Sequence, residues 1–430
     1  MSLAAPVSSP PAPAPDAAVA ARPRYRASIA YGVVALIALV WMPLRTPDGV
    51  TRFRLSTSTD FFAIPTFDVP AAAAVWVLVL VAVGLAAFSV WATRAGRRTG
   101  MWLPVVFGVA LLLAFLTFAG AGRATVIPLT SIATGTLFLA TPLIFGALSG
   151  VVCERVGIVN IAIEGQLLAG AFLAAVVGSL TASAYMGLVA APIAGALVGT
   201  LLVFFAVRYQ VNQIIVGVVL NVLVVGLTSF LFSTVLSEDP STWNARQSLP
   251  VLPIPVLSQI PVIGPILFRQ TLLVYLMYVI VAALQVYLFR SRWGLRVRAV
   301  GEHPKAADTV GIDVNRTRVR NAILGSAVAG LGGAFFTVAS GLAFGKEMTG
   351  GRGFIALAAM ILGRWSPKGA VAAALLFGFA DNLRTVLGTI GSSVPPQLLL
   401  MTPYIVTILA VAGFAGRVRA PAAEGVPYVK

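Results

Sequence analysis

Long apolar runs separated by short polar segments extend along almost the whole chain. A helix needs about 20 mostly apolar residues to cross roughly 30 Å of hydrocarbon. The pattern predicts spans at 28–44, 70–93, 101–121, 127–150, 159–179, 185–207, 213–237, 270–290, 321–342, 352–363, 368–388 and 398–416. Since 352–363 is too short to cross alone, we interpret it as half of a broken helix or as a re-entrant element. The expected fold is all-α, a polytopic transmembrane helix bundle of about 10–12 spans.

Three polar segments differ from ordinary short loops. Residues 1–27 are rich in Ala, Pro and Ser and offer too little apolar surface to offset the entropy of ordering, so we expect a disordered cytoplasmic tail. The run from Ile29 to Leu44 is not followed by a small-residue cleavage site, which favours a retained span over a signal peptide. The proline-rich segment 238–269 is expected to be an extended excursion outside the membrane. The largest inner loop is 291–320.

The basic residues indicate how the chain is oriented. Lys and Arg number 30 against 14 Asp and Glu, a formal net charge of +16. They lie between apolar runs, notably at Arg94, Arg97 and Arg98 and in the series from Arg290 to Arg320, as the positive-inside rule describes for cytoplasmic loops. Both termini are therefore expected in the cytoplasm. A nucleic-acid partner is disfavoured, because cations that bind phosphate should form one patch on a soluble face.

Composition supports the membrane class and disfavours most enzymes. Hydrophobic residues make up 59% of the chain and charged residues only 10%, whereas soluble domains average about 25% charged residues. The mean hydropathy is +0.95. With one cysteine, Cys153, and one histidine, His303, an intrachain disulfide is excluded and a metal site built on these residues is disfavoured. We expect no metal, no cofactor and no catalytic residue in this chain.

Polar side chains inside the apolar runs are candidates for function or for packing. Asn160 and Glu164 are four residues apart and share one helix face. Glu164 should face protein or water. Three interpretations stay open: it lines a path, it fixes a helix junction beside Arg155, or it is a buried, hydrogen-bonded packing residue. Asn221 is expected to hydrogen-bond between helices. Small residues at helical spacing predict close helix approach; they are Ala322, Gly325, Ser326, Ala329, Gly330, Gly333 and Ala334, with Gly195 and Gly199.

A second polar cluster, Asp381, Asn382 and Arg384, falls near the outer half of the predicted span 368–388. Asp381 and Arg384 are three residues apart and therefore able to pair on one helix face. The expected role of this cluster is an interfacial anchor.

The inner loop contains a charged stretch, Gly301-Glu302-His303-Pro304-Lys305-Ala306-Ala307, followed by Gly311-Ile312. Pro304 is well placed to open a short helix over Lys305–Val310. Two interpretations stay open from the residue types alone. The segment is either a compact helix that docks on a soluble partner or a solvated basic loop that only sets topology.

Three stretches resemble one family of membrane proteins. They are Cys153-Glu154-Arg155-Val156-Gly157-Ile158-Val159-Asn160-Ile161-Ala162-Ile163-Glu164-Gly165, the inner-loop stretch, and Gly351-Arg352-Gly353-Phe354-Ile355-Ala356-Leu357-Ala358 through Gly363-Arg364-Trp365-Ser366-Pro367. All three are similar to motifs of ABC permeases for sugars, nucleosides and branched-chain amino acids. The third stretch, with Pro403-Tyr404, Gly416-Arg417 and Ala420-Pro421-Ala422-Ala423, resembles the nucleoside-type branch. Cys153 stands where the family often has Gly. The resemblance covers residues 125–425, which leaves 28–124 as additional amino-terminal transmembrane helices.

The resemblance implies the membrane-spanning permease subunit of an ATP-driven importer of nucleosides or related ribose-containing solutes in a bacterial inner membrane. The implied partners are an ABC ATPase subunit, a second homologous permease subunit, an extracytoplasmic solute-binding lipoprotein and membrane lipid. Permeases for simple sugars or branched-chain amino acids, and an ion-coupled secondary transporter, are the alternatives. The chain has no Gly-x-x-x-x-Gly-Lys-Ser/Thr loop, the nearest approach being Gly345-Lys346-Glu347. ATP and Mg are therefore expected on the partner ATPase.

Two sets of candidate residues follow. The resemblance implies that the inner loop couples to the ATPase, through Gly301, Glu302, Pro304, Lys305, Ala306 and Gly311. A nucleoside has a flat base and hydroxyls, so its path should offer amide, hydroxyl and aromatic groups. The path candidates are Asn160, Glu164, Asn221, Phe354 and Asn382.

Overall fold

The structure is a computed structural model, and it describes residues 25–97, 99–100, 102–390, 401 and 419–429. Most of the predicted tail 1–27 and nearly all of the predicted span 398–416 lie outside the described residues, as do Pro403, Tyr404, Gly416 and Arg417. The described part of the chain is divided into two compact units. The first contains residues up to Thr46 together with Ala73–Phe115, and the second contains Pro47–Ala72 together with the chain from Leu116 onward.

Ten helices in the described part of the chain are long and apolar enough to span a membrane, which confirms the predicted polytopic helical fold. They are α1 (Arg26–Trp41), α2 (Ala71–Arg94), α3 (Trp102–Gly120), α4 (Leu129–Glu154), α5 (Ile163–Leu180), α6 (Ala184–Val203), α7 (Gln213–Leu231), α10 (Leu272–Arg290), α13 (Val314–Gly333) and α15 (Pro367–Ile390). Helices α6, α7 and α13 each continue into a π-helical turn, at Phe204–Arg208, Phe232–Leu236 and Phe335–Ala339.

The first unit is a group of three apolar helices, α1, α2 and α3, with few polar contacts. Its buried centre consists of small and aromatic side chains, Ala35, Ala82, Ala86 and Phe107. One hydroxyl group adds a polar contact between helices, because Ser28 Oγ lies 2.8 Å from Ser89 Oγ and 3.0 Å from Thr93 Oγ1.

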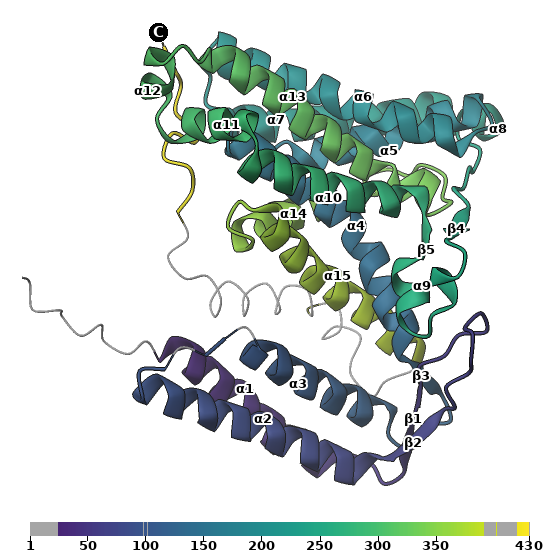
Figure 1. Cartoon of the computed structure of the whole chain (residues 1–430). Helices are drawn as coiled ribbons and strands as arrows, with labels where there is room; N and C mark the ends of the chain where they lie inside the picture. The colour runs from purple at the N-terminus through teal and green to yellow at the C-terminus, as the bar shows by residue number, and fades with distance from the viewer. Residues whose placement is uncertain (1–24, 98, 101, 391–400, 402–418, 430) are drawn as a thin grey trace, which may run out of the picture. The chain divides into compact units, whose positions relative to one another are not determined.

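The second unit is built around α13, which packs against α4, α5 and α6, while α15 packs along α4 (Figure 1). The predicted close approach of small residues is confirmed. A Cβ added to Gly330 would lie 2.7 Å from the backbone nitrogen of Gly195, and one added to Gly333 would lie 2.7 Å from the backbone nitrogen of Ala171. Because any side chain there would meet backbone, glycine sets the spacing of α5, α6 and α13.

The inner loop 291–320 is largely helical. Helix α11 (Arg292–Glu302) and α12 (Pro304–Thr309) occupy its first part. The predicted short helix opened by Pro304 is therefore confirmed. The predicted start of the next span at 321 is wrong: α13 begins at Val314, because Asp313 Oδ1 accepts a hydrogen bond from the Arg316 backbone N–H and caps the helix. The segment 352–363 is the short helix α14 (Arg352–Leu362).

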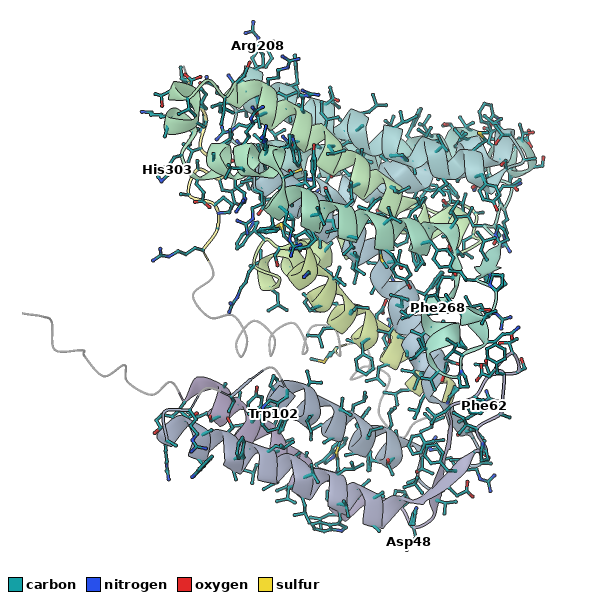
Figure 2. The ribbon with its side chains drawn as sticks, in the orientation of Figure 1. Asp48, Phe62, Trp102, Arg208, Phe268 and His303 are labelled. Carbon is teal, nitrogen blue, oxygen red and sulfur yellow. The ribbon has the colours of Figure 1, made fainter. Side chains whose placement is uncertain are left out.

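Two small sheets, which the hydropathy pattern did not predict, lie at the other end of the second unit. Strand β1 (Val50–Arg54) pairs with β2 (Phe67–Pro70) and with β3 (Val126–Pro128). Strand β4 (Val251–Pro253) pairs with β5 (Arg269–Thr271). The segment 238–269 is thus only partly extended, since it also contains α8 (Pro240–Trp243) and α9 (Ile263–Leu267). Figure 2 shows Phe62 and Phe268 at this end and Arg208 and His303 at the opposite end.

Candidate functional site

The start of the short helix α14 is held by one carboxylate from another helix. Glu164, in the first turn of α5, is only 8% exposed. Its Oε1 accepts from Thr349 Oγ1 (2.6 Å) and from the Gly351 N–H (2.8 Å), and its Oε2 accepts from the Gly353 N–H (2.6 Å). Free amides at a helix N-terminus carry partial positive charge, so a carboxylate is well suited to satisfy them. We call this arrangement the α14 cap.

The α14 cap leaves no room for a side chain at Gly353. A Cβ there would lie 2.5 Å from both the Cα and the backbone nitrogen of Glu164. The next residue, Phe354, points away from this contact and is 51% exposed. The cap therefore fixes where α14 begins and presents an aromatic ring beside that point.

Asn160 lies inside a fully buried hydrogen-bond network. Its Nδ2 donates to Ser149 Oγ (3.1 Å) and to Gln166 Oε1 (3.0 Å), and its Oδ1 accepts from Gln166 Nε2 (3.0 Å). Gln166 Nε2 also donates to Ser326 Oγ (2.9 Å). The network joins α4, α5 and α13, and Asn160 is 0% exposed. Asn160 itself precedes α5, which begins at Ile163, so the predicted helix face shared with Glu164 is wrong. The amide group of Asn160 is engaged within the protein in this conformation.

The other two path candidates with amide side chains also connect segments. Asn221 on α7 accepts from the Gly165 N–H (2.7 Å) and donates to the Ile161 carbonyl (2.9 Å). Asn382 on α15 donates to the Ile132 carbonyl on α4 (2.6 Å). Both side chains are buried. Of the five path candidates, only Phe354 has a largely exposed side chain.

A charged cluster links α14 to α15. Arg352 Nη2 lies 3.1 Å from Asp381 Oδ2, and Arg384 Nη2 lies 2.9 Å from Asp381 Oδ1, which confirms that Asp381 and Arg384 pair. The Arg352 guanidinium also lies over the Phe336 ring, 5.7 Å from its centroid. Charged groups on membrane helices are usually paired in this way, and here a half-buried carboxylate inside α15 lies between two guanidiniums.

A second contact region, which we call the Arg155 junction, brings together residues 154–158, 300–303, 363–366 and 421–426. Arg155 Nε donates to the Trp365 carbonyl (2.8 Å), and Trp365 Nε1 donates to Glu154 Oε2 (2.5 Å). The Arg155 guanidinium lies over the Phe289 ring. Burial lowers the pKa of Arg155, and the nearby Glu302 carboxylate opposes that shift, so the side chain stays a cation.

Gly301 at the end of α11 contacts the backbone of the Arg155 turn directly, because a Cβ there would collide with the Arg155 carbonyl oxygen. The segment 421–426 covers this contact. The Ala423 N–H donates to the Gly301 carbonyl (2.9 Å), and the Ala422 N–H donates to Glu302 Oε2 (3.2 Å). Figure 1 shows this yellow segment beside α11 and α12.

Arg318 ties the same segment to α13. Its Nη1 donates to the Val426 carbonyl (2.8 Å), and its side chain is buried. The Gly425 N–H donates to the Gly157 carbonyl (3.2 Å). Burial raises the pKa of the Glu424 carboxyl, whose hydrogen bond to Glu154 partly opposes the shift. The junction therefore connects α11, α13 and the ends of α4 and α14.

The remaining coupling candidates lie on or next to α12. Lys305 and Ala306 are exposed, Pro304 is half-buried, and Ala307 is buried against the rest of the protein. Gly311 has a φ of +84°, a backbone conformation that favours glycine, at the turn after the helix. Helix α12 thus presents one face outward while its base is attached to the Arg155 junction through α11.

Sequence reasoning missed several members of these contacts. Arg318, Trp365, Thr349 and Gln166 were not candidates, and Glu424 lies far along the chain from its partners. Trp365 could have been identified from the sequence, because it stands in the third stretch that resembles the permease family. Among the described residues, no group of three or more His, Cys, Asp or Glu side chains is placed to hold a metal ion.

Comparison with known proteins finds one matching family. Residues 132–411 match the model of the branched-chain amino acid transport system / permease component. The chain is 38% identical to the guanosine ABC transporter permease protein NupQ of Bacillus subtilis over 70% of this chain and 97% of that protein. It is 39% identical to the nucleoside ABC transporter permease protein NupC of Lactococcus lactis, over 70% and 96% of the two chains. A putative glucose ABC transporter permease protein, TsgC13 of Haloferax volcanii, is 31% identical over 64% and 84%. No solved structure gives a significant match to the chain.

Proposed function

The chain belongs to the branched-chain amino acid transport system / permease component family, and from that premise we propose that it is the membrane-spanning permease subunit of an ABC importer for nucleosides. It is a multi-pass membrane protein. Two nucleoside permeases match it at 38% and 39% identity over nearly their whole length. This similarity favours nucleosides over the glucose named for a relative at 31% identity.

One structural observation supports the mode of coupling. The outward face of α12 is attached, through Gly301, to a junction that also holds Trp365, which lies between α14 and α15. Pressure on α12 from a partner ATPase would therefore reach α4 and the region between α14 and α15 through packed backbone, without a flexible linker. Packed contacts of this kind transmit displacements because they have little room to deform.

The proposed transporter has further parts. ATP and Mg would bind to the ATPase subunit. A second homologous permease would complete the passage, and an extracytoplasmic lipoprotein would deliver the solute. The concentration of Lys and Arg near α11 to α13 supports an orientation with α12 in the cytoplasm of a bacterial inner membrane.

Phe354 is the path candidate that we propose contacts the solute, since its ring is exposed beside the α14 cap. Aromatic faces stack on nucleobases. In the same proposal, Glu164, Asn160, Asn221 and Asn382 position the helices that border the path.

The test is uptake of radiolabelled guanosine into proteoliposomes that contain the chain with its ATPase, second permease and binding protein. We expect ATP-dependent uptake that unlabelled nucleosides compete and glucose does not. Glu302→Arg should lower uptake about tenfold, because it replaces the acceptor of the Ala422 N–H with a like-charged group beside Arg155 and Arg298. Glu238→Arg, on an exposed residue outside the junction, is the matched control. Uptake by the chain alone without nucleotide hydrolysis would contradict the proposal.

A separate experiment tests the path. Phe354→Ala should reduce guanosine uptake while ATPase activity of the complex is retained, whereas Phe230→Ala, on an exposed ring of α7, should leave uptake unchanged. Equal uptake in both variants would remove Phe354 from the path without affecting the assignment of the importer. Competition by glucose in place of nucleosides would instead identify a sugar permease.

A further inference from the structure

A groove of about 700 Å³ lies between α11, the turn that follows α12 and the first turns of α13. Four guanidinium groups line it, from Arg292, Arg296, Arg316 and Arg320. All four side chains are exposed. In the part of the chain that the structure describes, none of them forms an ion pair. The lining contains one acidic side chain, Asp313, whose Oδ1 accepts a hydrogen bond from the Arg316 backbone N–H. Because four guanidinium groups face this single carboxylate, the groove is strongly cationic.

A buried polar atom also belongs to this groove. Asn321 is 1% exposed and lines the groove. Its Nδ2 donates to the Thr317 carbonyl (2.7 Å), but its Oδ1 has no hydrogen-bond partner among the described residues. A buried acceptor without a partner destabilises the protein, because it has lost its hydrogen bonds to water and gained none in return. A ligand that brings a hydroxyl donor to this atom would remove that cost.

The walls between the arginines are apolar. Leu295 and Val310 are 62% and 74% exposed, and Trp293 and Ile312 complete the lining. The groove also lies where two membrane helices meet the polar region, because α10 ends at Arg290 and α13 begins at Val314. Lipid headgroups occupy this level of the bilayer, with acyl chains next to them. A ligand of this groove should therefore combine an anionic group, a hydroxyl and an apolar body.

We propose that this groove binds the headgroup of an anionic glycerophospholipid with a hydroxylated headgroup, of which phosphatidylglycerol is an example. Arginines bind the phosphodiester, because guanidinium matches phosphate oxygens in geometry as well as charge. The Asn321 Oδ1 accepts from a headgroup hydroxyl. Trp293, Leu295 and Val310 contact the apolar part. Basic pockets between membrane helices are known to select anionic lipids on this basis, and the site does not depend on which solute is transported.

The test is native mass spectrometry of the purified full transporter complex after addition of defined lipids. We expect phosphatidylglycerol to be retained at least tenfold more than phosphatidylcholine. The double variant Arg292→Ala, Arg320→Ala should lose most of that preference. The control, Arg94→Ala with Arg208→Ala, removes two cations outside the groove and should keep it. Asn321→Leu should retain binding of phosphatidic acid but lose the preference for phosphatidylglycerol over phosphatidic acid.

Three results would overturn the proposal. Equal retention of phosphatidylcholine would show no headgroup selection. Displacement of the lipid by 10 mM inorganic phosphate would indicate a site for soluble phosphate. Loss of the ATPase subunit from the complex in the groove variant, with lipid retention unchanged, would identify the groove as a protein interface. Thermal midpoints of the variants, measured in parallel, distinguish each of these results from misfolding.

Discussion

The two units of this chain contrast in how their helices are held together. In the first unit, only 28% of the apolar stretch of α1, and the same share of α2, is buried. A Cβ added to Gly32, Gly84 or Gly108 would have no atom within 4 Å. In the second unit, the central helices α4 and α13 are 83% and 78% buried over their apolar stretches, although α7 and α10 at its periphery are only 33% and 28% buried. Several glycines of α5, α6 and α13, among them Gly170, Gly195, Gly330 and Gly333, would meet backbone if they carried a Cβ. The family match begins at residue 132, inside the second unit. Glycine therefore sets close helix packing in α5, α6 and α13, but not at Gly32, Gly84 and Gly108 of the first unit.

Polar groups follow the same division. In the first unit, the Ser28 hydroxyl contacts the hydroxyls of Ser89 and Thr93 on another helix. The second unit contains the Asn160 network, the α14 cap and the Arg155 junction, each of which joins segments far apart in the sequence. Satisfied polar contacts inside a membrane protein specify geometry as well as adding stability. Polar contacts between distant segments therefore specify the helix arrangement of the second unit.

The largest expected effect comes from placing a side chain where two helices touch. Gly333→Val should prevent accumulation of folded protein, because its Cβ would meet the backbone of α5 and overpacking costs about 1–3 kcal/mol or more. Gly84→Val in the first unit should accumulate at the wild-type level. The measurement is size-exclusion chromatography of fluorescently tagged protein extracted from membranes. Equal accumulation would remove the contrast between the units.

The next effect concerns the α14 cap. Glu164→Ala leaves the N–H groups of Gly351 and Gly353 and the Thr349 hydroxyl without their acceptor, at a cost of about 1–3 kcal/mol per buried group. We expect guanosine uptake to fall more than tenfold and the thermal midpoint to drop. Glu238→Ala, on an exposed carboxylate, is the control. Wild-type uptake in Glu164→Ala would show that the cap is dispensable for transport.

The next prediction concerns how the stability of the Arg155 junction depends on pH through Glu424. Burial raises the pKa of Glu424, so the folded protein binds more protons than the unfolded chain between the ordinary carboxyl pKa and the raised one. Stability from this group therefore falls as pH rises through that window. Glu424→Gln should raise the thermal midpoint at pH 7.5, and the gain should shrink toward pH 4.5.

Asp239 provides a control of opposite sign for that titration. Hydrogen bonds from Ser241 and Thr242 lower its pKa, so its contribution is present at neutral pH and is lost as pH falls. Asp239→Asn should therefore lower the midpoint slightly at pH 7.5 and leave it unchanged at acid pH. The same direction of change in both variants would contradict the assignment of Glu424.

The smallest expected effect comes from removing one serine hydroxyl in each unit. Ser89→Ala removes a hydroxyl contact of the first unit, and hydrogen bonds between membrane helices average only about 0.6 kcal/mol. Ser326→Ala removes the partner of Gln166 in the buried network and should lower the midpoint more. Uptake should change only for Ser326→Ala. Identical midpoints would show that the network adds nothing beyond a single pair.

Much of this architecture could be predicted from sequence because its causes are local. The lengths of the apolar runs predicted the spans, and the position of Pro304 predicted the short helix α12. The small residues around Gly330 predicted where helices approach closely. The start of α13 was missed because Arg316, Arg318 and Arg320 are hydrophilic, while the cap by Asp313 and the contacts of Arg318 with residues 423–426 make them helical. Asn160 bonds to Ser149 and Gln166, which lie close to it in the sequence. The partners of Glu164 come from a distant segment, and spacing along the chain carries no information about them.

Backbone contact between α5, α6 and α13 has a mechanical consequence. Where glycines meet carbonyls, no side chain is available to change rotamer and absorb a displacement, so these three helices should move together as one stiff block. The start of α14 belongs to the same block, because Gly353 meets the backbone of Glu164 on α5. Alternating exposure of a passage must then use the joints around that block, at α7 and α10. A cross-link between α6 and α13 should therefore leave the transport cycle running.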